Sequence, residues 1–330
     1  MSGLSALWGW KKMMSFNCKE CQLDFDTKRG LHAHIKKHGY CLGDYYVKYY
    51  ARRDKLTNEL LPFIKYDDYF TREFSHLPNR DKWLKTAPRE ETQKYLCDLI
   101  KGWVKKRGID YGPSDLELLS ADLPGVDTYK EHFGSYTDVC ERCGVVPRLK
   151  NPLPKNFFKD YAETHILIDT REKQPLAFAN SSLFKLDVGD YSVKADKFKY
   201  TFVDRKSFPD FCISVTASYD RFAREMDRCR EMGCYMFVVI EIEYQNINKF
   251  NRQSYKKHNL GYVLGNMRKL QAQYSDCVQF VFGGSRAYSA LLIPKLLCLG
   301  DEAWGTDINY FWAQFLENQK LKKNHGLGGW

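Results

Sequence analysis

The feature that most constrains the fold is a set of short apolar runs, between residues 165 and 282, several of which lie beside charged side chains. The run His165-Ile166-Leu167-Ile168-Asp169 is typical of a buried strand that ends in a carboxylate, and residues 200–206 predict another strand. Apolar runs at 235–240 and 278–282 predict strands buried on both faces. A helical pattern over 216–232 lies between the strands predicted at 200–206 and 235–240, so we expect an α/β domain.

Charged residues around the strand at 200–206 form a group suited to metal-dependent hydrolysis. Alternate side chains of a strand share a face, so Asp204 and Lys206 point the same way and Arg205 points the opposite way. Asp190 supplies a second carboxylate. Carboxylates suit a hard cation such as magnesium or manganese, which can activate water against a phosphodiester. A lysine beside the metal can orient that water and stabilise the developing charge.

The spacing of these residues resembles a known nuclease signature. The pattern G-D-x(13)-D-R-K-x(3)-D, from Gly189 to Asp210, is similar to that of XPF-type nucleases, a branch of the PD-(D/E)xK superfamily. Upstream Asp169-Thr170-Arg171-Glu172 and downstream Tyr219-Asp220-Arg221-Phe222 match the family as well. The resemblance implies a restriction-endonuclease-like mixed sheet flanked by helices over residues 161–303. It also implies cutting of DNA that leaves 5′-phosphate ends.

The resemblance also assigns roles by position. It implies that Asp190 and Asp204 hold the metal, that Lys206 orients water, and that Asp169 and Glu172 complete the acidic site, with Arg205 and Asp210 in support. Asp204 departs from the family's usual glutamate by one methylene. Arg221 on the following helix could contact phosphates or form part of a solvated face. A degenerate domain that does not cut is the alternative, although neither the lysine nor either metal-binding acid is missing.

Residues 14–40 carry the ligand spacing of a structural zinc site. Cys18 and Cys21 are followed after twelve residues by His34, and then by His38 on the same helix face. With apolar Phe16, Phe25 and Leu31, the segment closely resembles a two-cysteine, two-histidine zinc finger with a ββα fold. His32 is a rival ligand by count, but it lies on another face of the helix.

This finger is poorly equipped to read bases. The positions that usually contact base edges hold Thr27, Gly30 and Ala33, of which glycine and alanine carry no side-chain donor. The basic residues nearby can instead contact phosphates: Lys28, Arg29, Lys36 and Lys37. We therefore expect backbone contacts to DNA, or packing on a neighbouring segment. A zinc site that only stabilises the fold, without contacting DNA, is the alternative.

Residues 41–147 predict a mainly helical DNA-docking module. A helix over 92–107 ends in cations that include Lys105 and Arg107. The run LPGVDTYKEHFGSYTDVCERCGV resembles the helix-turn-helix repeats of phage and homing endonucleases. Its Cys140 and Cys143 read as small core residues, with a second zinc site as the alternative. Residues 148–160 read as a linker, and 304–330 as a final helix with a basic tail.

Composition is compatible with a nucleic-acid partner. The net charge of +10 is divided evenly between residues 1–150 and 151–330. We expect duplex DNA as the partner and no membrane segment, since no window holds about 18 consecutive apolar residues. The isolated cysteines and the lack of a secretion signal favour an intracellular protein found with the DNA, in a prokaryotic cytoplasm or a nucleus.

Together these features predict a metal-dependent DNA endonuclease directed to a site by its N-terminal modules, as in phage or mobile-element nucleases. A structure-specific flap or junction nuclease and a non-cutting regulator are the alternatives. Family nucleases often end in paired helix-hairpin-helix modules, which this chain lacks. Their absence weakens the case for branched-DNA specificity. It also weakens the case for a homodimer through the nuclease domain.

Overall fold

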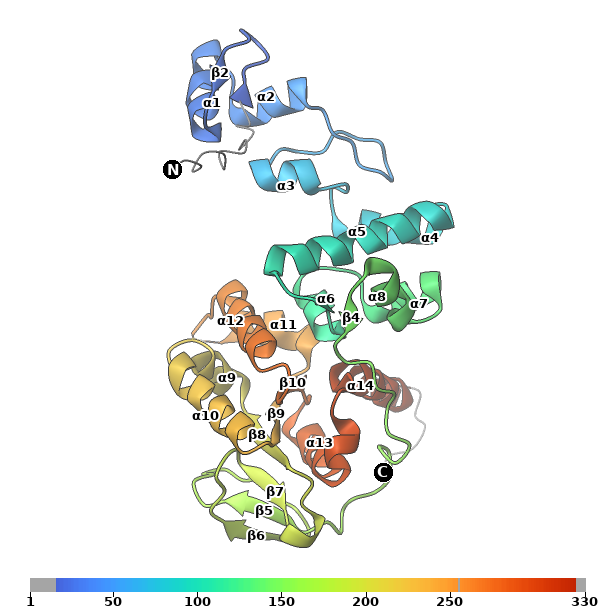
Figure 1. Cartoon of the computed structure of the whole chain (residues 1–330), viewed down its shortest axis with the longest axis vertical. Coiled ribbons are helices and arrows are strands. Elements are labelled where there is room, and N and C mark those ends of the chain that lie inside the picture. The colour runs from blue at the N-terminus through green and yellow to red at the C-terminus, as the bar shows by residue number, and fades with distance from the viewer. Residues whose placement is uncertain (1–15, 255, 325–330) are drawn as a thin grey trace, which may run out of the picture. The chain divides into compact units, whose positions relative to one another are not determined.

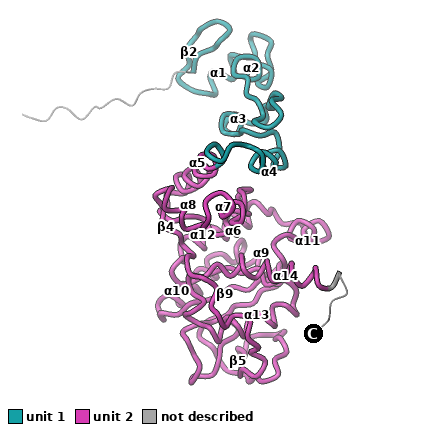
Figure 2. The backbone as a smooth tube through the Cα atoms, turned by 90° about the vertical axis from the view of Figure 1, so that its right-hand side faces the viewer, with its two compact units in different colours: residues 1–92 teal, residues 93–330 magenta. Residues whose placement is uncertain are grey.

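The computed structural model describes residues 16–254 and 256–324. An alternative start at Met13 or Met14, which the sequence also suggests, lies outside these residues. The chain forms two compact units, residues 1–92 and 93–330, which Figure 2 draws in different colours.

The first unit has an aromatic core that includes the predicted finger. Its elements are β1 (Phe16–Asn17), β2 (Asp24–Phe25), α1 (Lys28–Ile35), α2 (Leu42–Tyr49), α3 (Tyr66–Thr71) and α4 (Leu77–Thr86). Cys18 and Leu31 of the finger are buried together with Tyr45, Tyr46 and Tyr69. The finger is therefore packed on α2 and α3 through shared apolar surface.

The second unit begins with a helical part. Its elements are α5 (Arg89–Arg107, which starts in the first unit), β3 (Tyr111–Gly112), α6 (Asp115–Ser120), α7 (Val126–Phe133), α8 (Tyr136–Cys143) and β4 (Val146–Pro147). Ser114 caps α6 in a capping box with Glu117, and Ser135 caps α8. Three short helices thus lie between residues 115 and 143.

A six-stranded mixed sheet organises the rest of this unit, with strand order β10-β9-β8-β7-β5-β6. Its strands are β5 (Ile166–Asp169), β6 (Ser181–Phe184), β7 (Tyr191–Val193), β8 (Thr201–Lys206), β9 (Tyr235–Ile240) and β10 (Val278–Phe282). β7 runs antiparallel to both β5 and β8, and the other neighbouring pairs are parallel. The predicted mixed sheet is confirmed.

Helices cover both faces of the sheet (Figure 1). One face packs in a core, here called the α10-side core, that contains Phe202, Phe222 and Met226. The opposite α13-side core contains Val203, Leu292 and Trp312. The helices are α9 (Phe208–Ser214), α10 (Tyr219–Glu231), α11 (Ile247–Gln253), α12 (Leu260–Gln273), α13 (Arg286–Leu299) and α14 (Ile308–Asn324), with short 3-10 turns at Lys36–His38, Ala195–Lys197, Tyr244–Asn246 and Gly300–Ala303.

The compact units divide at residue 92, whereas the sequence placed a linker at 148–160. The helical part joins the sheet and its helices because buried polar groups connect them. Arg148, buried beside Glu117, donates to the Val278 carbonyl of β10 at 3.4 Å, and the amide of Asp115 donates to Asp307 Oδ2 at 2.8 Å.

Two further features of the described chain bear on the predictions. α14 extends to Asn324, so the residues predicted as a basic tail continue the last helix. Over the residues described, none of the helices is long and apolar enough to cross a membrane.

Candidate active site

A glycine turn places Asp190 at the start of β7. Gly189 has φ +68°, and a Cβ there would lie 2.9 Å from the Val203 carbonyl oxygen, so the turn requires glycine. The Asp190 amide donates to Val203 O, and its carbonyl accepts from the Asp169 amide, each at 2.8 Å. Asp190 is thus held between β5 and β8, and its Oδ2 accepts from the Arg205 amide at 2.8 Å.

Asp204 and Lys206 form a buried ion pair on the α10 side of β8. Lys206 Nζ lies 2.8 Å from Asp204 Oδ2 and donates to Oδ1 at 3.0 Å. Burial lowers the pKa of Lys206, but the charge and hydrogen bond of Asp204, together with the charges of Asp190 and Glu225, outweigh it, and the net shift is upward. The ammonium therefore stays charged beside the carboxylate, as the sequence predicted from their spacing on one strand face.

Burial and the charge of Asp204 raise the pKa of Asp190 well above its usual range. Two neighbouring carboxyl groups of this kind favour either a shared proton or a bound cation. Asp204 Oδ2, although close to Lys206, accepts no hydrogen bond. A hard divalent ion would satisfy such oxygens, so this donor set fits magnesium or manganese held by Asp190 and Asp204.

Glu225 on α10 is a fourth member of this group that the sequence reasoning missed. Its Oε1 accepts from the Gly189 amide at 3.2 Å, next to Asp190. Burial and the charge of Asp204 raise the pKa of Glu225. The available signal was its position on the buried face of the helix, between Phe222 and Cys229.

Asp169 has a structural task in the site. It is 1% exposed, and its oxygens accept from Arg171 Nε at 2.6 Å, from the Arg171 amide at 2.8 Å and from the Leu186 amide at 2.7 Å. Burial opposes ionisation, but the Arg171 hydrogen bonds prevail and lower the pKa of Asp169. Asp169 therefore anchors the two loops that border the acids.

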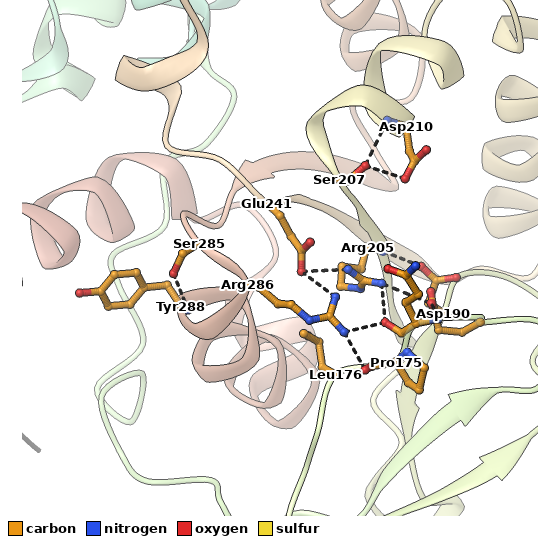
Figure 3. A network of polar contacts seen from close by, with 12 residues as sticks. Pro175, Leu176, Asp190, Arg205, Ser207, Asp210, Glu241, Ser285, Arg286 and Tyr288 are labelled. Atoms are coloured by element: carbon orange, nitrogen blue, oxygen red, sulfur yellow. Dashed lines mark hydrogen bonds and ion pairs between the residues drawn. The ribbon is translucent and has the colours of Figure 1, made fainter. Parts of the chain in front are cut away.

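Arg205 and Glu172 lie on the opposite side of β8 from Lys206. Arg205 contacts Glu172 at 3.3 Å and Glu241 at 2.9 Å, and Glu241 also pairs with Arg286 at 3.5 Å (Figure 3). The guanidinium of Arg286 donates to the carbonyls of Gln174 and Pro175 at 2.7 Å. The network joins β8 and β9 to the start of α13, behind the strand that carries Asp204.

Two other predicted residues lie apart from the group of acids. Asp210 accepts from the Ser207 hydroxyl at 2.6 Å, while its amide donates to that hydroxyl at 3.3 Å, so it helps to cap α9 (Figure 3). Arg221 is exposed on α10. The structure thus brings together Asp190, Asp204 and Lys206, and adds Glu225.

The predicted zinc ligands converge in the first unit. One ligand atom from each of Cys18, Cys21, His34 and His38 lies within 4.8 Å of the others, and within the described chain this is the one such group of three or more. His34 Nε2 lies 3.0 Å from both Cys21 Sγ and His38 Nε2. The soft sulfur and imidazole donors fit zinc.

The predicted phosphate-contacting residues differ in their surroundings. Lys28 pairs with Asp67 at 2.9 Å and lies over the Tyr66 ring, whereas Arg29, Lys36 and Lys37 are exposed. His32 contacts the Tyr46 hydroxyl at 3.0 Å rather than the ligand group. In the second unit Lys105 is exposed, while Arg107 lies over the Trp103 ring.

Cys140 and Cys143 occupy the core of the helical part. Burial raises the pKa of Cys140 to about 11, and burial with neighbouring Cys97 raises that of Cys143 to about 12. Such thiols stay protonated, which favours core packing over a second zinc site.

The fold is a mixed sheet flanked by helices, and the site gathers two acids and a lysine at one end of its central strands. The comparisons identify the domain. Residues 163–296 match the family described as the ERCC4 domain, which is the nuclease domain of XPF-type DNA nucleases. The predicted resemblance to XPF-type nucleases is thus confirmed for this part of the chain.

Two solved structures are similar over part of their length. XPF from Aeropyrum pernix is 20% identical, with a TM-score of 0.30, over 41% of this chain and 60% of that one. XPF from Aeropyrum pernix in complex with DNA has the same identity, TM-score and share of this chain, with 64% of its own length covered. The chain thus spans less than two thirds of these relatives. No curated protein matches it.

Proposed function

We propose that the protein is a metal-dependent DNA endonuclease that hydrolyses phosphodiester bonds and leaves 5′-phosphate ends. The observation that carries this is the convergence of Asp190, Asp204 and Lys206, with Lys206 Nζ 2.8 Å from Asp204. Asp190 and Asp204 would hold magnesium or manganese, which when bound would activate water and neutralise charge on the phosphate. Lys206 stays charged and would orient the attacking water.

The remaining assigned residues support this centre in the proposal. Asp169 fixes the bordering loops, Arg205 and Glu172 join β8 to the network behind it, and Asp210 caps the next helix. Zinc at Cys18, Cys21, His34 and His38 would stabilise the first unit. The exposed cations would contact the backbone of duplex DNA: Arg29, Lys36, Lys37, Lys105 and Arg221.

Site-directed cutting, as in phage or mobile-element nucleases, is one form of this proposal. The finger's base-reading positions favour a second candidate. Thr27, Gly30 and Ala33 offer little for sequence readout, so cutting directed by DNA structure is the alternative.

Cleavage assays test the proposal. Purified protein is given supercoiled plasmid, random-sequence duplex and branched oligonucleotides with magnesium, and the ends are mapped and tested for ligation. We expect cutting that Asp204→Asn lowers roughly 100-fold or more. The matched control is Asp196→Asn, an exposed acid after β7. Wild-type protein that binds DNA but never cuts would instead support a regulator.

A further inference from the structure

The edge strand β6 exposes two large apolar side chains that the active site does not explain. All four of its residues are exposed, Leu183 by 69% and Phe184 by 55%. β6 pairs only with β5 in the described sheet, so it forms one edge. Large apolar side chains at an exposed edge strand indicate a contact with another molecule.

The strand register assigns these two side chains to different faces. Phe184 pairs with Asp169, and Leu183 with Ile168. Ile168 belongs to the α13-side core, whereas Leu167, two residues before Asp169, packs on the α10-side core. Paired residues share a face, so Phe184 lies on the α10 face and Leu183 on the other.

The α10 face is also the face of the catalytic group. Phe202 of β8 packs in the α10-side core, and Asp204 and Lys206 follow it at alternate positions. In the order β8-β7-β5-β6, Phe184 lies three strands from Asp204. At about 4.8 Å per strand this is about 14 Å. About four stacked nucleotides would span it at about 3.4 Å each.

A fixed guanidinium lies between the acids and this edge. The side chain of Arg171 is 61% exposed, yet it donates to both oxygens of Asp169, at 2.6 and 3.1 Å, and to the Leu186 carbonyl at 2.7 Å. The charges of Asp169, Glu225 and Asp190 all help to raise the pKa of Arg171, which places it near the catalytic acids. Exposed Lys185 directly follows Phe184 just beyond the end of β6, so strand alternation does not fix its side chain on the opposite face.

We propose that Phe184, with Arg171 and Lys185, forms a subsite for an unpaired nucleotide of the substrate. The Phe184 ring would stack on the base, and the two cations would contact the adjoining phosphates. The proposal rests on the proposed nuclease function and adds to it a residue that would select DNA with an unpaired strand over blunt duplex. Cations beside an exposed ring suit a nucleic-acid strand better than an apolar protein partner.

Measurements of DNA binding test the subsite. They are made in the Asp204→Asn background, which prevents cutting, and in calcium, which can occupy an oxygen site. The probes are a blunt duplex and the same duplex with an unpaired tail carrying 2-aminopurine, whose fluorescence falls on stacking. We expect Phe184→Ala to weaken binding of the tailed duplex about tenfold and to abolish the quenching, with blunt-duplex affinity unchanged. Tenfold corresponds to about 1.4 kcal/mol. Phe184→Trp should retain binding and quenching.

Leu183→Ala is the matched control, because Leu183 is as exposed but lies on the opposite face. Equal losses for Leu183→Ala and Phe184→Ala, or a dimer that either variant disrupts, would show that β6 pairs with protein and overturn the subsite. Unchanged tailed-duplex affinity in a folded Phe184→Ala protein would also overturn it. If the wild-type protein does not cut DNA but Phe184→Ala still weakens binding of the tailed duplex, the nuclease proposal fails and the subsite proposal stands.

Discussion

At the scale of single residues, the site depends on buried charges that stabilise one another. Asp190, Asp204, Lys206 and Glu225 interact across the space between β7, β8 and α10. Each carboxyl would cost free energy if it were buried alone, so Lys206 and a cation are needed to balance them. This mutual dependence makes metal binding sensitive to pH.

We expect manganese affinity to rise with pH over the range in which Asp190 loses its proton. Its pKa is raised, so at lower pH the carboxyl is protonated and cannot bind a cation. At pH values above the ordinary pKa of an aspartate but below the raised pKa of Asp190, manganese binding should therefore release a proton. Calorimetry in two buffers of different ionisation enthalpy measures that release, and proton-free binding at every pH would contradict it.

Glu225 should contribute both charge and a hydrogen bond. Glu225→Gln keeps an acceptor for the Gly189 amide but removes a negative charge near Asp204, so manganese affinity should fall about tenfold. Glu225→Ala also leaves the amide unpaired, which should destabilise the fold by about 1–3 kcal/mol. Exposed Glu231→Gln on the same helix is the control, and equal affinity in all three variants would exclude a role for the charge.

The sequence predicted the members of the site that share a short motif. Asp190, Asp204 and Lys206 follow from a strand period and a fixed spacing. Glu225 is about 20 residues further on, and only tertiary packing brings α10 over the Gly189 turn. Asp169 and Asp210 were predicted as site acids, but their hydrogen bonds to Arg171 and Ser207 are set by local loop geometry.

At the scale of elements, the turn before β7 is where backbone conformation sets the chemistry. Gly189→Ala should destabilise the protein by about 3 kcal/mol, because its φ of +68° is combined with a contact to Val203 O. Gly233→Ala is a matched control: its φ is +65° with open space, so only about 1 kcal/mol is expected. Urea unfolding measures both, and equal losses would show that the contact is unimportant.

The junction between α6 and α14 predicts a pH-dependent stability. Burial and the neighbouring charge of Asp307 raise the pKa of Asp115 to about 7. The folded state therefore holds a proton that the unfolded chain releases near pH 4, so stability falls as pH rises from about 4 to 7. Asp115→Asn keeps an acceptor for the Val126 amide and should be more stable than wild type at pH 8, by on the order of 2 kcal/mol.

Thermal melts at pH 5 and pH 8 measure this difference, which should be smaller at pH 5 than at pH 8. A variant that is equally destabilised at both pH values would contradict the buried-charge explanation. Exposed Asp138→Asn on α8 provides a control with no expected pH-dependent difference.

Strands with long apolar runs were predicted well, and the short exposed strand β6 was not. The strands at 235–240 and 278–282 were recognised because almost all of their residues are apolar. β6 was missed, since its Ser181-Ser182-Leu183-Phe184 sequence is wholly exposed and short. Its pairing depends on β5 being in place, which a local pattern does not show.

At the scale of the whole molecule, the two units use different sources of stability. Residues 93–330 have two large apolar cores on either side of a sheet. The first unit has a small aromatic core into which Cys18 is packed beside Tyr45 and Tyr46. A small core of this kind commonly needs a metal to remain folded.

We therefore expect zinc removal to unfold the first unit and to spare the second. Chelation releases Cys18, whose Sγ belongs both to the ligand group and to the aromatic core, so the tyrosines around it should lose their packing. Near-ultraviolet circular dichroism and limited proteolysis of the full chain should show cleavage within residues 16–92, while the thermal transition of residues 93–330 is unchanged. His38→Asn should reproduce the effect, whereas His32→Gln should retain one zinc per chain, because His32 contacts Tyr46 instead of the ligands. A chelated protein with intact tyrosine signals would mean that the aromatic core alone holds this unit together.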